Sequence, residues 1–152
     1  MEWWQQLILS LVTLLLGAFL GYFLTRLGAK QERISRAAKK LDEAVCGILV
    51  ELETNLKLTE SPSQKRLVPF VTSMWEMNKG EIIRLPKELK DALYQVYVEI
   101  GIANNLVEAD IHQLKYGLGY YNGSYKEKKN SIAEKSKQVI KDLEDWLRKR
   151  GK

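Results

Sequence analysis

The sequence predicts an all-α protein in which one N-terminal transmembrane helix continues into an antiparallel cytoplasmic bundle of three long helices and one short helix. Three observations predict this fold class. Residues 7–24 carry no charge, apolar residues recur every seven positions in two later segments, and no pair of segments alternates as β-strands do. The predicted domains are a transmembrane anchor at 1–27, a juxtamembrane stalk at 28–60 that is also the first bundle helix, and the remaining bundle at 61–152.

The apolar run at residues 7–24 is long enough to cross a bilayer. Its 18 residues form a helix of about 27 Å, against a hydrocarbon core of about 30 Å. Trp3 and Trp4 are suited to the headgroup region at one end. A cleaved signal peptide is the competing interpretation, but Glu2 is the only charged side chain before the run and no A-x-A site follows it. We therefore expect the run to be retained as an anchor.

Charge predicts how this anchor is oriented. Six basic residues and one acidic residue, Glu32, lie between positions 26 and 40, and no Lys or Arg precedes the run. The positive-inside rule then places the short N-terminus outside and everything after residue 27 in the cytoplasm of a cell membrane. Basic residues near a bilayer also bind anionic lipid headgroups, at about 1 kcal/mol each. The six residues are Arg26, Lys30, Arg33, Arg36, Lys39 and Lys40.

A small-residue stripe lies within the predicted span. Its members, Thr13, Gly17, Gly21 and Thr25, are four positions apart and therefore share one helix face. Small residues allow helix backbones to approach closely in lipid, where burial of apolar surface does not drive association. The stripe predicts that the protein forms a homo-oligomer.

The stalk continues this helix with a heptad pattern. Two rows of residues repeat every seven positions, which is typical of a helix that packs along a coiled-coil seam. Asn55 ends one row, where a polar side chain costs stability and fixes register, and Ser61-Pro62-Ser63 ends the helix. The rows are Ile34, Leu41, Ile48, Asn55 and Ala38, Val45, Leu52, Thr59.

Three further helices are expected. A short one covers 73–79, with Ser73 and Glu76 as a capping box and Gly80 as its end, and an extended linker follows at 81–85. Pro86 then opens a long amphipathic helix. A last helix begins near residue 130, with a second capping box at Ser131 and Glu134. The long helix places two rows on its apolar side: Leu89, Val96, Ala103, Asp110 and Leu93, Ile100, Val107, Leu114.

A loop rich in tyrosine and glycine separates the last two helices. Tyrosine supplies contact area and a polar tip, so the loop is a possible interaction surface for a partner. The preferred interpretation is that the glycines shape a turn and the tyrosines cover the end of the bundle. The tyrosines are Tyr116, Tyr120, Tyr121 and Tyr125.

Residues 68–107 also carry a resemblance. The segments VPFVTSMWE, GEIIRLPKEL and LYQVYVEIGIANNLVE resemble small prokaryotic membrane-anchored helical proteins of uncharacterised function. The resemblance covers about a quarter of the chain and implies a helical fold at a membrane, with no activity attached to it.

No catalytic, cofactor-binding or metal-ligating residue is predicted. His112 is the single histidine, and Cys46, beside the heptad seam, is expected to be a small buried residue. G-x-S-x-G, P-loop and dinucleotide-binding motifs are absent from the sequence. We expect a non-enzymatic assembly protein that self-associates and presents its bundle to a protein partner.

Two alternatives remain open from the sequence. One is an oligomeric channel or pore, although the span offers no ionisable side chain to a conducting path. The other is a membrane-tethered nucleic-acid-binding protein. Nucleic acid is not the expected partner, because aromatic residues do not interleave with the basic cluster.

Overall fold

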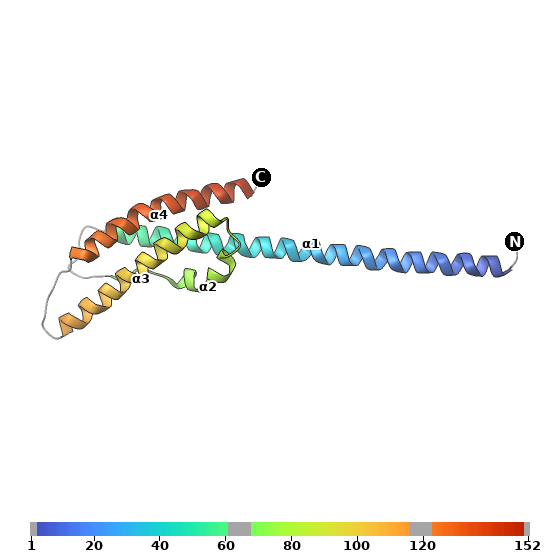
Figure 1. The fold of residues 1–152 in the computed structure, drawn as a ribbon, viewed down its shortest axis with the longest axis horizontal. Helices are drawn as coiled ribbons and strands as arrows, with labels where there is room; N and C mark the ends of the chain where they lie inside the picture. Colours follow the sequence, from blue (N-terminus) through green and yellow to red (C-terminus); the bar gives the residue numbers. More distant parts are fainter. Residues whose placement is uncertain (1–2, 61–67, 116–122, 151–152) are drawn as a thin grey trace. The chain divides into compact units, whose positions relative to one another are not determined.

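A computed structural model describes residues 3–60, 68–115 and 123–150. These residues form four helices and no strand: α1 (Trp3–Glu60), α2 (Ser73–Ile82), α3 (Lys87–Lys115) and α4 (Gly123–Arg150) (Figure 1). The all-helical prediction is confirmed for these ranges. One helix, α1, is long and apolar enough near the N-terminus to cross a membrane.

The chain divides into two compact units, residues 1–40 and residues 41–152. The boundary lies within α1, so residues 28–40 of the predicted stalk belong to the first unit and residues 41–60 to the second. The described residues of the first unit, 3–40, are all helical. None of its most apolar 18-residue window, with a mean hydropathy of 2.4, is buried in the protein.

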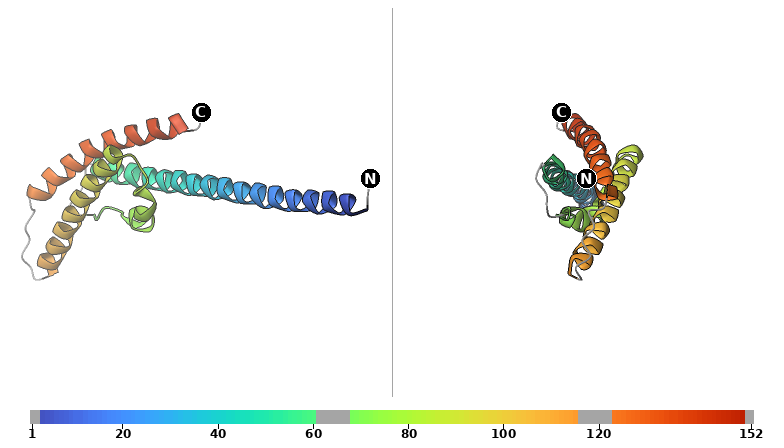
Figure 2. Two further views of the ribbon diagram at one scale, coloured as in Figure 1. Left: turned by 45° about the vertical axis from the view of Figure 1, so that its right-hand side comes forward. Right: turned by 90° about the vertical axis from the view of Figure 1, so that its left-hand side faces the viewer.

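The second unit has one hydrophobic core, to which all four helices contribute. Leu93 and Ile100 of α3 are fully buried, and α3 packs along α4 (Figure 2). The heptad rows of α1 supply Leu41, Val45, Ile48 and Leu52 to this core. Upstream of residue 41 the heptad row of Leu41 and Ile48 is no longer buried, since Ile34 is 61% exposed. The side chains of Asp110 and Leu114, expected on the apolar side of α3, lie outside the described residues.

The predicted start of α2 at Ser73 is confirmed, but its predicted capping box and its predicted end are wrong. The residue before the helix is Thr72, whose carbonyl accepts from the backbone N–H of Glu76 at 3.0 Å, and no side chain of the helix's own first turn caps it. Gly80 lies inside α2, which continues to Ile82. The predicted linker at 81–85 is turned rather than extended, because Leu85 N–H donates to Ile82 O at 3.0 Å. Burial of Ile82 in the core explains why the helix passes Gly80.

The start of α4 is also earlier than predicted. The helix begins at Gly123, so Ser131 lies well inside it and does not cap it. Instead, the Ser131 side chain forms a hydrogen bond with Glu99 of α3. Tyr125, buried in the first turn, anchors the additional residues against the core. The start of α3 fits the prediction, since Pro86 precedes Lys87 and its carbonyl accepts from Lys90 N–H at 3.0 Å.

Candidate functional site

The small-residue stripe is an open surface in the first unit. A Cβ added to Gly17 or Gly21 would have no atom within 4 Å outside its own helix. The hydroxyl of Thr25 donates to Gly21 O at 2.8 Å, so its polar group is satisfied within α1. The stripe thus exposes small side chains and backbone, and the Thr25 hydroxyl needs no partner outside its own helix.

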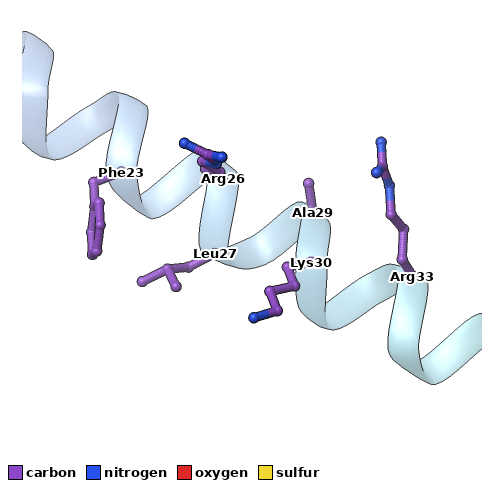
Figure 3. Close-up of a pocket in the computed structure, with 6 residues that line it drawn as sticks. All are labelled: Phe23, Arg26, Leu27, Ala29, Lys30 and Arg33. Atoms are coloured by element: carbon purple, nitrogen blue, oxygen red, sulfur yellow. The ribbon is translucent and has the colours of Figure 1, made fainter.

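The basic residues after the span occupy different faces of α1. Arg26, Lys30 and Arg33 lie around a hollow of about 610 Å³ on one side of the helix, together with Phe23, Leu27 and Ala29 (Figure 3). We call Arg26, Lys30 and Arg33 the basic face. Arg36, one turn further, pairs with Glu32, and both side chains are exposed.

The stripe and the basic face lie on nearly opposite sides of α1. Each residue turns the helix by about 100°, which places the mean direction of Gly17, Gly21 and Thr25 about 150° from that of the basic face. A helix that packed through the stripe would therefore leave the basic face directed away from its partner.

The tyrosines of the predicted interaction loop have separate positions. Tyr116, Tyr120 and Tyr121 lie outside the described residues. Tyr125 belongs to α4, is only 5% exposed, and donates from its hydroxyl to Val68 O at 3.0 Å. Tyr125 is thus a packing residue of the second unit rather than an exposed contact.

Three helices hold one extended segment, residues 68–72, which we call the strap. Asn55 of α1 pairs with the backbone of Val71: its Oδ1 accepts from Val71 N–H at 2.8 Å and its Nδ2 donates to Val71 O at 2.7 Å. Asn104 of α3 pairs in the same way with Phe70, at 2.7 and 3.0 Å. The hydrogen bond from Tyr125 to Val68 adds a contact from α4. The backbone N–H and C=O groups of Phe70 and Val71 are therefore paired without a β-sheet.

Glu51 of α1 caps the start of α2 from outside that helix. Its side chain is only 3% exposed. Oε2 accepts from Met74 N–H at 2.6 Å, and Oε1 accepts from Trp75 N–H at 3.1 Å. These are the backbone donors that a helix start leaves unpaired, and a carboxyl group there also interacts favourably with the helix dipole. Glu51 replaces the capping box predicted at Ser73 and Glu76.

Tyr97 of α3 completes this polar cluster. Its hydroxyl donates to Glu51 Oε1 at 2.7 Å, so one carboxyl group joins α1, α2 and α3. Burial raises the pKa of Tyr97 well above its ordinary value, and the hydrogen bond with Glu51 and its charge raise it further. The Tyr97 ring stacks on Trp75 with centroids 4.3 Å apart, and Tyr94 meets Trp75 edge-on at 4.9 Å. Trp75 thus fills the space between α2 and α3.

A second polar contact joins α3 and α4. Lys135 forms an ion pair with Glu99, whose side chain is largely buried. Burial alone would raise the pKa of Glu99, but hydrogen bonds from Lys135 and Ser131 and the charges of Lys135 and Lys128 outweigh it and hold the pKa below its ordinary value of 4.5. The contact stabilises the packing of α3 against α4.

The chemistry available in the described ranges is limited. No group of three or more His, Cys, Asp or Glu side chains in them is arranged to hold a metal ion. Cys46, expected to be buried, is exposed on α1, because the core contacts of this helix fall on Val45 and Ile48. The polar groups described above serve helix capping, binding of the strap and the pairing of α3 with α4.

Sequence reasoning missed Glu51 and Asn104 as structural residues. A signal was present for both: Glu51 lies three positions after Ile48 and four before Asn55, and Asn104 lies four after Ile100. These spacings place each polar side chain beside an apolar face. Comparison of the chain with protein-family models, curated proteins and solved structures found no match. The functional argument therefore depends on the geometry of the chain itself.

Proposed function

We propose that this protein is a single-pass membrane protein that displays a helical assembly domain in the cytoplasm. The transmembrane anchor predicted at residues 1–27 would cross the cell membrane, with the short N-terminus outside. Residues 41–152 would form an antiparallel bundle that contacts a protein partner or further copies of the chain. The proposed role is assembly, without catalysis.

The contrast between the two units carries this proposal. The apolar part of α1 is exposed on every side, including large side chains such as Trp3, Phe19 and Leu24, whereas the second unit has a core of its own. An apolar surface of this extent is unfavourable in water and is rare on soluble monomers. A bilayer covers it completely, and a helix also satisfies its backbone groups there.

Self-association is supported by two separate features of the first unit. The small-residue stripe is open on the span. Ile34, which continues the heptad row of Leu41 and Ile48, is exposed beyond the span. Two copies packed through the stripe could also bring their Ile34 side chains together only if Ile34 and the stripe lay on the same face of α1. At about 100° per residue, Ile34 lies about 140° from the stripe, so contacts through Ile34 would need a third helix or a different pairing.

A topology measurement tests the proposed arrangement. A reporter that is active only in the cytoplasm, fused after Lys152, should be active in cells, because the basic excess follows the span. A reporter that is active only outside the membrane should be silent at the same position and active when fused before Met1. Recovery of the full-length protein in the soluble fraction without detergent would overturn the membrane assignment. The reverse reporter pattern would overturn the orientation.

A further inference from the structure

We infer that the basic face of α1 binds the phosphate group of an anionic phospholipid. The site consists of Arg26, Lys30 and Arg33, with Phe23 and Leu27 beside the acyl chains. The inference rests on the proposed function, because it requires the anchor at residues 1–27 to cross a bilayer. It goes further in assigning lipid binding to three of the six basic residues.

The backbone positions of the three cations share one side of the helix, from which Arg26 and Arg33 extend upward and Lys30 downward in Figure 3. Turning about 100° per residue, Arg26, Lys30 and Arg33 fall within an arc of about 60°. Phe23 borders the same hollow on the side toward the apolar run, and Leu27 lies between Arg26 and Lys30 (Figure 3). Phe23 thus offers apolar contact on the side of the acyl chains, and Leu27 adds apolar surface beside the cations that would face the headgroup.

The charges on this face are available to an anionic ligand. Within the described ranges, no carboxylate forms an ion pair with Arg26, Lys30 or Arg33, whereas Arg36 is paired with Glu32. An arginine guanidinium binds phosphate oxygens through two parallel N–H donors, and a lysine ammonium supplies a compact charge. Two arginines around one lysine therefore provide the donors that a phosphodiester needs.

Depth in the bilayer separates the basic face from the other three residues. The headgroup layer is about 5–8 Å thick on each side of the hydrocarbon core. At 1.5 Å per residue, Arg33 is about 10 Å beyond Arg26, within reach of that layer for a long side chain that bends back toward it. Arg36 and Lys40 are about 15 and 21 Å beyond Arg26, in water. Their attraction to the surface is screened over about 8 Å at physiological salt.

The chain offers a matched pair of triple variants for a test. Arg26→Gln/Lys30→Gln/Arg33→Gln and Arg36→Gln/Lys39→Gln/Lys40→Gln each remove three positive charges from neighbouring turns of α1. The full-length proteins are placed in phosphatidylcholine vesicles that contain spin-labelled phosphatidylglycerol. The measured quantity is the association constant of the labelled lipid relative to labelled phosphatidylcholine, with circular dichroism as a check on helix content.

The parent protein should prefer phosphatidylglycerol. The first triple variant should lose this preference by at least about tenfold, given about fivefold per basic residue near the surface, and the second should retain it within about twofold. Equal losses in both variants would mean diffuse attraction and would overturn the site while leaving the proposed function intact. Competition by inorganic phosphate at constant ionic strength would indicate a free-phosphate site and would overturn the lipid assignment. Failure of the parent to enter neutral vesicles would overturn the proposed function itself.

Discussion

Asn55 on α1 and Asn104 on α3 bind neighbouring residues of the strap through the same arrangement of hydrogen bonds. Each side-chain amide donates one hydrogen bond and accepts one, and the backbone partners are Val71 for Asn55 and Phe70 for Asn104. An amide side chain has the same donor and acceptor pair as a peptide unit. The two asparagines therefore supply the hydrogen bonds that neighbouring β-strands would otherwise provide.

Replacing Asn104 with Asp should destabilise the second unit. Aspartate cannot donate to Phe70 O, and its second oxygen would face that carbonyl. We expect a loss of about 1–3 kcal/mol in the free energy of unfolding, the range for an unsatisfied buried polar group. Urea unfolding of residues 41–152, followed by circular dichroism, measures it. Asn105→Asp is the matched control, because Asn105 is the next residue and is exposed; a similar loss in both variants would argue against the Asn104 pairing.

Replacing Glu51 with Gln should weaken the start of α2. Glutamine can present an oxygen to Tyr97 and Trp75 N–H, but its amide nitrogen would then face Met74 N–H, which is also a donor. One buried donor would be left unpaired, at about 1–3 kcal/mol. Hydrogen exchange of the Met74 and Trp75 amides should accelerate as well. The control is Glu53→Gln, at an exposed position of the same helix; unchanged amide exchange in Glu51→Gln would contradict the capping role.

Stability of the second unit should depend on pH through Glu99. Because folding lowers its pKa, the carboxylate contributes stability above the ordinary pKa of 4.5, and that contribution is lost as the pH falls through the lower folded value. Glu99→Gln should remove this part of the acid dependence. In Lys135→Met the burial of Glu99 is no longer outweighed by its partner, so the Glu99 pKa should rise. Carbon-detected NMR titration of the carboxyl group measures the shift, and a further decrease would refute the assigned cause.

The small-residue stripe should control association in membranes. Isoleucine at Gly17 or Gly21 adds a branched side chain to a surface that is now open, and would keep a neighbouring helix at a greater distance. Gly17→Ile and Gly21→Ile should therefore reduce the oligomeric mass measured in detergent micelles or the energy transfer between labelled copies in vesicles. Leu16→Ile and Leu20→Ile are controls on other faces. Parent-like association in both glycine variants would leave the stripe without a role in assembly.

Periodicity predicted the helices but not the polar contacts between them. Rows such as Leu93, Ile100 and Val107 indicate a buried face, because one side of a helix recurs with its 3.6-residue repeat. All three residues are buried as expected. The start of α2 depends instead on Glu51, which is more than 20 residues away in sequence. Local rules such as the capping box consider only nearby residues, so they chose Ser73 and Glu76. The same limit applies to the strap, whose hydrogen-bond partners become neighbours only after the helices have packed.

The basic face and the small-residue stripe belong to the same helix but would lie in different surroundings. The stripe would lie in the hydrocarbon core of a bilayer and the basic face in its headgroup layer. The contacts of both surfaces therefore depend on the surrounding lipid, which the amino-acid sequence does not encode. Gly17 and Arg26 stand out in the sequence by their spacing and charge, whereas the lipid around them has no counterpart in the sequence.

The way the strap is held has an evolutionary consequence. The asparagine amides bind backbone N–H and C=O groups, which every residue other than proline possesses at Phe70 and Val71. The exposed side chain of Val71 is therefore free to drift, whereas proline there would remove the donor that Asn55 accepts from. Among diverged descendants of this chain, Asn55 and Asn104 should persist after the residue at position 71 has changed beyond recognition.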